Sequence, residues 1–266
     1  MEAPTVTVIT VTRGRPTLLR RAIESVAAQD LTSLAHFVIV DDCGLTRAFL
    51  QECSPEFPRL SWACLPRPGS SPNASGPPVN DSWPAARCAF LRNYGIHHSP
   101  SPWISFLDDD NEFEPNHLSS LLECARLTGA RAVHAWLQLF HQNGQPYLDS
   151  RHPWTPGADE ARRRFHVMVG QGILEPGSNV VRHRAYSEGS SEFIPAVDTS
   201  EWLLERSLLL EVPVPEEYSE DDCIRLRGED DKLLDALLVR KEPIGCSRTA
   251  TLRYYLGGYS NGCLRE

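Results

Sequence analysis

Residues 103–110 have the sequence Trp-Ile-Ser-Phe-Leu-Asp-Asp-Asp, a short apolar run that ends directly in three carboxylates. A continuous apolar segment of this length is typical of a strand buried on both faces of a sheet. Three adjacent carboxylates repel one another and are costly unless water or a cation compensates their charge. We therefore predict a buried strand from Trp103 to Leu107 that leads into a solvated or cation-binding acidic triplet.

Two similar apolar runs come earlier in the chain. Val6–Val11 is rich in β-branched residues, and Pro16 is placed to open a helix in which apolar residues recur at helical spacing. Phe37–Val40 predicts a second buried strand, which ends in Asp41 and Asp42. Strand, helix and strand in this order form a βαβ unit with a right-handed crossover. The sequence thus predicts an α/β fold with a mostly parallel central sheet flanked by helices.

The remaining pattern extends this fold. We expect strands at 60–65 and 132–140, and helices over 85–97, from Pro115, over 202–210 and over 229–239. The Pro-, Gly- and Ser-rich stretch 66–84 predicts a long surface loop, either a mobile lid or a disordered insertion, and 152–189 is turn-rich. A regular first half and an irregular second half suggest one continuous domain, with cofactor binding in residues 1–127 and substrate binding and the catalytic base in 128–266.

Three polar clusters follow the predicted strands: Thr10–Thr12, Asp41–Asp42 and Asp108–Asp110. In an open α/β sheet, ligands bind beyond the carboxyl ends of the strands, where the strand order reverses. If the first strand and the Trp103 strand flank that point, all three clusters line one crevice.

The acidic triplet has two interpretations. Asp108 and Asp110 are two residues apart, so on an extended segment they face the same way while Asp109 points elsewhere. All-oxygen ligands suit Mg²⁺ or Mn²⁺, which commonly bridge carboxylates to substrate phosphates. The alternative is a solvated turn that caps the next helix. Its position after a buried strand favours the metal site. For Asp41–Asp42 the alternatives are a turn or helix cap and a contact with a nucleotide base or ribose.

A second acidic cluster, Glu229–Asp230–Asp231, opens the predicted helix after Gly228. Acidic residues are favoured at helix N-termini by the helix dipole, so capping is one explanation. A carboxylate there can also project into a crevice as a general base. The neighbouring run 220–222 lacks this context, and we expect it to be a solvated loop.

Net charge, hydropathy and cysteine distribution argue against several classes of protein. The 266 residues carry a formal net charge of −9, which argues against binding along a nucleic-acid backbone. No apolar run is long enough to span a membrane, and the N-terminus lacks a secretion signal, so we expect a cytoplasmic protein. The eight scattered cysteines are then reduced thiols, and the sequons at Asn73 and Asn80 are chance matches. The abundance of Ala, Arg and Pro is compatible with a bacterium of high GC content.

The same clusters, in the same order, resemble glycosyltransferase family 2. The opening VTVITVTRGRPTLLRRAIESVAAQ resembles the family's first strand, its T-x-N-R-P turn and its first helix, and FVIVDDCG resembles the second strand with its paired aspartates. AARCAFLRNYGIHHSPSPWISFLDDDNEFEPNHL is similar to the A-R-N-x-G-I helix and the strand that carries the DXD motif. GEDDKLLDALL resembles the late E-D motif, and TLRYYLGGYSNG the closing Arg-Tyr segment. The resemblance covers residues 5–127 and returns at 226–262.

This resemblance implies a GT-A fold and an inverting transfer from a nucleoside-diphosphate sugar, most often UDP-linked, to a hydroxyl acceptor, assisted by Mn²⁺ or Mg²⁺. It also implies roles for individual residues. Asp230 is the general base, with Glu229 and Asp231 as neighbouring candidates, and Asp110 binds the metal together with Asp108. The donor-binding set comprises Thr10, Thr12, Arg13 or Arg15, Asp42, Asp108 (at the ribose) and Asp109.

Two departures from the family pattern stand out. Gly14 occupies the place of the usual Asn, so a side-chain contact there is missing or replaced. The closing segment 255–259 lacks the late histidine of many relatives, which suggests a weaker metal requirement. Two other functions fit part of the pattern: a sugar nucleotidyltransferase, which would normally show a Gly-rich basic loop after the first strand, and a non-catalytic nucleotide-sugar-binding pseudoenzyme. The sequence leaves open whether the acceptor is a small molecule, a saccharide or a peptide, and whether the protein is oligomeric.

Overall fold

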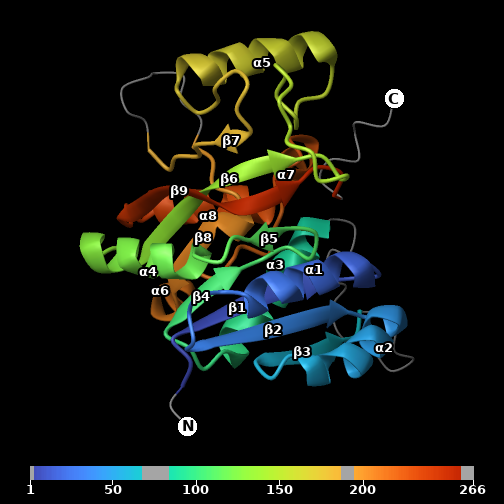
Figure 1. Cartoon of the computed structure of the whole chain (residues 1–266). Coiled ribbons are helices and arrows are strands. Elements are labelled where there is room, and N and C mark those ends of the chain that lie inside the picture. The colour runs from blue at the N-terminus through green and yellow to red at the C-terminus, as the bar shows by residue number, and fades with distance from the viewer. Residues whose placement is uncertain (1–2, 68–83, 187–194, 259–266) are drawn as a thin grey trace.

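A computed structural model describes residues 3–67, 84–186 and 195–258 (Figure 1). Most of the predicted loop 66–84 and both sequons lie outside these ranges. The strands are β1 (Val6–Thr12), β2 (Leu34–Asp41), β3 (Leu60–Leu65), β4 (Trp103–Phe106), β5 (Glu112–Phe113), β6 (Ala132–Phe140), β7 (Val180–Val181), β8 (Trp202–Glu205) and β9 (Ile244–Tyr255). The helices are α1 (Pro16–Ala27), α2 (Gly44–Cys53), α3 (Pro84–His98), α4 (His117–Thr128), α5 (Ala158–Gly170), α6 (Arg206–Glu211), α7 (Glu220–Ile224) and α8 (Glu229–Val239), with short 3₁₀ turns η1 (Ser54–Glu56) and η2 (Thr199–Glu201).

One sheet runs through the whole molecule in the order β3-β2-β1-β4-β8-β6-β9-β5, with β7 paired to β6. The four strands β3, β2, β1 and β4 are parallel, and beyond β4 the sheet is mixed. Because β1 lies between β2 and β4, the strand order reverses there. This confirms the predicted α/β fold, and it puts the predicted ligand crevice at the carboxyl ends of β1 and β4.

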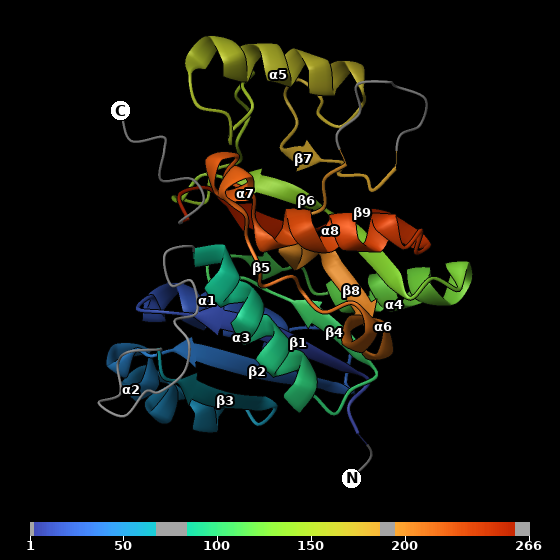
Figure 2. The ribbon, with the colours of Figure 1, turned by 180° about the vertical axis from the view of Figure 1, so that it is seen from behind.

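Helices cover both faces of the sheet. Figure 1 shows α1 and α4 over one face, and Figure 2, from behind, shows α3, α6 and α8 over the other. The first face buries Val8 and Leu121, and the second buries Ile9, Phe106 and Leu237. Alternate residues of β1 thus point into two cores, as the pleat of a strand requires.

Tertiary pairing overrides two local predictions. The run 202–210 was expected to be a helix, but Trp202–Glu205 forms strand β8 and only Arg206–Glu211 is helical. Its apolar residues are buried because β8 pairs with both β4 and β6, which helical periodicity does not reveal. The run 220–222, expected to be a loop, opens helix α7, since Ser219 and Asp222 form a capping box. The turn-rich region 152–189 also contains α5.

Two features bear on the bulk predictions. None of the seven cysteines in the described ranges forms a disulfide. Within the same ranges, every helix is too short or too polar to cross a lipid bilayer.

Helix α3 crosses β1 and β2 closely at Gly95. A Cβ atom there would lie 2.8 Å from Ile9 Cγ2 and 2.9 Å from Ile39 Cδ1, both fully or almost fully buried. We expect Gly95→Ala to destabilise the fold by about 1–3 kcal/mol through overpacking, against the small gain in helix propensity. Chemical denaturation measures this change. Gly170→Ala, at a position with open space around the Cβ, is the matched control, and equal stability of both variants would contradict the close crossing.

Candidate active site

The acidic triplet begins two residues after β4 and divides into one interior and two accessible carboxylates. Asp109 is fully buried and accepts hydrogen bonds from Thr12 Oγ1 at 2.6 Å and from Arg15 Nε at 3.2 Å. Burial raises the pKa of Asp109 to about 7, although Arg15 and Thr12 favour its charged form. These contacts join the turn after β1 to the turn after β4. Asp109 therefore has a structural contact with Thr12 and Arg15 that fixes the two turns relative to each other.

Asp108 and Asp110 remain accessible, with side chains 32% and 15% exposed. Asp108 Oδ1 accepts from Arg92 Nη2 at 2.6 Å, and Asp110 Oδ2 accepts from Arg15 Nη1 at 2.7 Å. Burial raises the pKa of Asp110, and the neighbouring Asp108 charge raises it further. Each carboxylate is therefore held from one side by an arginine.

The sequence predicted a divalent metal ion at Asp108 and Asp110, and the structure shows which oxygen ligands are present there. Across residues 3–67, 84–186 and 195–258, no three His, Cys, Asp or Glu side chains gather around one metal position. Mg²⁺ and Mn²⁺ do not need such a cage, because one or two carboxylates suffice when phosphates and water complete the shell. Asp108 and Asp110 fit that smaller role. Beside them, a Cβ on Gly258 would lie 2.6 Å from Asp110 Oδ2, so the chain after β9 passes close to this carboxylate.

Arg92 links the second acidic cluster, residues 229–231, to the acidic triplet, residues 108–110. This arginine of α3 has a side chain only 4% exposed, and it pairs with Asp108 on one side and with Glu229, the first residue of α8, on the other. Asp231 accepts the Gly228 N–H at 3.1 Å, so the capping explanation holds for this residue. Asp230 is half-buried, and burial raises its pKa to about 8, with the charges of Asp231 and Glu229 adding to the shift. Of the three, Asp230 is the one whose carboxylate neither caps α8 nor pairs with Arg92.

Asp198 is a further acidic residue beside Asp108 and Asp230, and the sequence analysis missed it. Its side chain accepts the Ser200 N–H at 2.9 Å, its own N–H donates to Glu201 Oε2 at 2.7 Å, and Ser200 Oγ accepts the Asp108 N–H at 3.1 Å. Burial raises the pKa of Asp198 well above its ordinary value, and the charges of Asp108 and Asp230 raise it further. The sequence Asp-Thr-Ser-Glu at 198–201 is a capping-box pattern, and this signal could have identified the turn.

The cluster after β2 is organised around Asp41. Asp41 is buried and accepts from Arg87 Nε and Arg67 Nε, both at 2.9 Å, while Arg13 Nη1 lies at 3.7 Å. Asp42 adopts a positive φ of 43° and accepts the Arg67 N–H at 3.2 Å. The structure thus surrounds the paired aspartates with three arginines that the sequence pattern did not connect to them.

Thr10 lies apart from the other predicted residues. It is fully buried within the sheet, and its hydroxyl is 2.9 Å from His36 Nε2. To contact a nucleoside, as the sequence analysis expected, the Thr10 hydroxyl would have to give up its hydrogen bond to His36.

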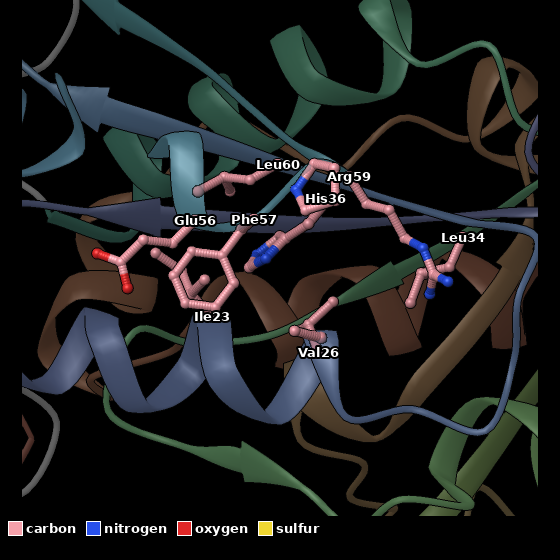
Figure 3. Close-up of a pocket in the computed structure, with 10 residues that line it drawn as sticks. Ile23, Val26, Leu34, His36, Glu56, Phe57, Arg59 and Leu60 are labelled. Carbon is pink, nitrogen blue, oxygen red and sulfur yellow. The ribbon is translucent and has the colours of Figure 1, made fainter. Parts of the chain in front are cut away.

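A separate hollow lies at the opposite end of β2 (Figure 3). It has a volume of about 210 Å³ and is bounded mainly by apolar side chains of α1, β2 and the η1–β3 connection, with His36 at its wall. Burial lowers the pKa of His36 to about 3, so this imidazole is neutral. The hollow lies at the amino end of β2, whereas the carboxylates of the crevice lie at the carboxyl ends of the strands.

Comparison with known proteins agrees with this arrangement. The model for glycosyl transferase family 2 matches residues 89–189, which include most of α3, all of β4 and the acidic triplet. No curated protein matches the chain significantly.

Solved structures with a similar fold include a UDP complex and a mannosyltransferase. Staphylococcus aureus TarS 1–349 in complex with UDP superposes with a TM-score of 0.58 at 14% identity, covering 96% of this chain and 62% of that one. The mannosyltransferase PcManGT from Pyrobaculum calidifontis, in complex with GDP-Man and Mn²⁺, gives 0.60 at 12% identity, covering 97% and 59%. The chain spans about three-fifths of the length of these neighbours. The fold is of the GT-A type, and the sequence of residues 89–189 is similar to glycosyl transferase family 2.

Proposed function

We propose that this protein is an inverting glycosyltransferase that moves a sugar from a nucleoside-diphosphate donor, in the first instance a UDP-sugar, to an acceptor hydroxyl. The observation that carries the proposal is the Arg92 bridge, an arginine that pairs with both Asp108 after β4 and Glu229 at the start of α8. A donor-binding carboxylate and a candidate base at Asp230 thereby share a single site. A non-catalytic binding protein would not need the second.

In this proposal the donor lies along the carboxyl ends of β1, β2 and β4. Asp42 and Arg13 contact the nucleoside, Thr12 and Asp109 fix the turn beneath it, and Asp108 accepts hydrogen bonds from the ribose. Asp110, with Asp108, would hold Mn²⁺ or Mg²⁺ beside the diphosphate, and that ion would supply positive charge as the leaving group departs. Arg15, which already contacts Asp110, adds fixed positive charge at the same place.

Asp230 acts on the acceptor. Its carboxylate takes the proton of the acceptor hydroxyl while that oxygen forms a bond to the anomeric carbon, and the bond from that carbon to the phosphate oxygen breaks. Attack opposite the leaving group inverts the anomeric configuration. A raised pKa makes Asp230 a stronger base than an exposed aspartate, which suits the weakly acidic proton of a hydroxyl.

The ligands of the structural neighbours support a nucleoside-diphosphate donor, but they differ in the nucleobase of that donor. TarS has been solved with UDP and with UDP-GlcNAc, and PcManGT with GDP-Man and Mn²⁺. Uracil and guanine differ in size and in hydrogen-bonding edges, so direct binding separates them.

Calorimetric titration with UDP, GDP and dTDP, each with Mn²⁺ and with chelator, tests the donor site. We expect metal-enhanced binding of one nucleotide, with UDP preferred, and a loss of about tenfold or more in Asp110→Ala, because a charge-assisted contact is worth about 1.5–3 kcal/mol. Asp159→Ala, at a side chain 97% exposed on α5, is the matched control. Binding of no nucleotide under any condition would refute the donor assignment, and binding indifferent to Mn²⁺ and to Asp110→Ala would refute the metal site.

A further inference from the structure

A second cavity lies on the sheet, away from the acidic crevice. It has a volume of about 230 Å³ and is lined by residues of β6, β9 and the segment after β7, among them Trp136, Arg184, Tyr186 and Arg248. Tyr186 Oη donates to the Glu242 carbonyl at 2.6 Å, just beyond the C-terminus of α8. Since α8 has 11 residues at 1.5 Å each, Glu242 and the Glu229–Asp230 pair are at opposite ends of a helix about 16 Å long.

An irregularity in β9 supplies one wall. His134 pairs with Cys246 and Trp136 with Ala250, so β9 advances four residues where β6 advances two. Arg248 lies at the centre of this bulge with a φ of +56°, and the hydroxyls of Ser247 and Thr249, 2.9 Å apart, close it. Bulges redirect side chains, and a left-handed backbone is unfavourable for arginine. The fold thus accepts a strained residue that places a guanidinium at the cavity.

The charge of the cavity is unusual for this protein. The chain has 35 acidic and 26 basic residues, yet the charged residues lining this cavity in the described ranges are the two arginines. Arg248 makes no ion pair with any residue that the structure describes. Guanidinium groups pair bidentately with carboxylate and phosphate, so the cavity suits an anion.

Aromatic side chains add a second kind of contact. The Tyr186 side chain is 46% exposed and is oriented by its bond to Glu242, and the Trp136 ring forms part of the same cavity. Tyrosine and tryptophan offer rigid, amphipathic surfaces at low entropic cost, which fits the flat apolar face of a sugar ring better than a bare inorganic ion.

We infer that this cavity is a second ligand site, which binds a sugar ring bearing a carboxylate or phosphate group. Arg248 and Arg184 contact the anionic group, and Trp136 and Tyr186 contact the ring. The site is separate from the donor crevice, so its occupation does not depend on the proposed transfer reaction.

Titrations with D-glucuronate, glucose 6-phosphate, D-glucose and inorganic phosphate, followed by saturation-transfer NMR and calorimetry, test this site. We expect at least one charged sugar to bind about tenfold or more tightly than glucose or phosphate alone, since hydrogen bonds to charged groups contribute about 1.5–3 kcal/mol. The preference between glucuronate and glucose 6-phosphate identifies the anionic group. If inorganic phosphate binds as tightly as both charged sugars, the sugar assignment is wrong. If glucose binds as tightly as both charged sugars, the anion assignment is wrong.

Arg248→Gly is the informative variant, because glycine accepts the positive φ without strain. We expect it to lose charged-sugar binding about tenfold while keeping or raising the melting temperature, and Arg248→Lys to retain part of the binding. Arg126→Gln, at an exposed arginine of α4, should bind as the wild type does. Charged-sugar binding that survives in Arg248→Gly would place the ligand elsewhere, for instance in the donor crevice, and would refute the inference.

Discussion

Asp230→Asn is expected to lower the rate of sugar transfer by about 10²–10⁴-fold, the usual contribution of a general base. Asparagine keeps the size of the side chain and removes its ability to take a proton. The variant should bind the donor nucleotide as the wild type does, because in the proposed mechanism Asp230 acts on the acceptor and not on the donor. Transfer assayed by nucleoside-diphosphate release, together with nucleotide titration, separates these two effects.

Asp235→Asn is the matched control, since Asp235 is exposed on the same helix and pairs with Arg227. A further signature is the pH profile. A folded-state pKa raised to about 8 means that Asp230 is largely protonated at neutral pH, so kcat/KM should rise with pH until about 8 and then level off. If Asp230→Asn retains near-normal turnover, the base is another residue, and Asp231→Asn, Glu229→Gln and Asp198→Asn should be compared next.

Arg92→Met is expected to cost about 3–5 kcal/mol of unfolding free energy and to abolish transfer. Arg92 is the buried cation between Asp108 and Glu229, and removing one member of a buried ion pair leaves the others uncompensated. Methionine fills similar volume, so the loss reports on charge more than on a void. For a chain of this size the melting temperature should fall by on the order of 10 °C.

Arg126→Met gives the comparison for an exposed arginine paired with Glu123, where less than about 1 kcal/mol is expected. Arg92→Lys should lie between the two, because an ammonium keeps the charge and loses the planar fork. An Arg92→Met protein with wild-type stability would show that the Asp108–Arg92–Glu229 bridge contributes nothing to the fold. An Arg92→Met protein that keeps wild-type stability but loses transfer would show that the bridge serves the active site and not the stability of the fold.

Local pattern was sufficient for most of the first half of the fold. Val6–Val11, Phe37–Val40 and Trp103–Leu107 are predominantly apolar, because parallel strands between two layers of helices have no solvent-facing side. Such strands can be recognised without knowledge of their neighbours, and the residues that follow them must lie at the carboxyl edge. The position of the acidic triplet at that edge was predictable for this reason.

The second half depended on contacts distant in the chain. The strand at Trp202–Glu205 resembles part of an amphipathic helix until β4 and β6 are beside it. Asp198 enters the site only because the η2 turn is bonded to Asp108 through Ser200.

By itself, the sequence determined the α/β class, the edge of the sheet where polar residues collect, and the helix that carries Glu229–Asp231. Tertiary structure alone decided which carboxylates are interior and which are accessible: Asp109 is bonded to Arg15 and Thr12, Asp231 caps α8, and burial raises the pKa of Asp230 to about 8. The physical reason is that a carboxylate's role depends on its desolvation and on the cation beside it. Arg92 and Glu229, 137 residues apart, become partners only in the folded chain.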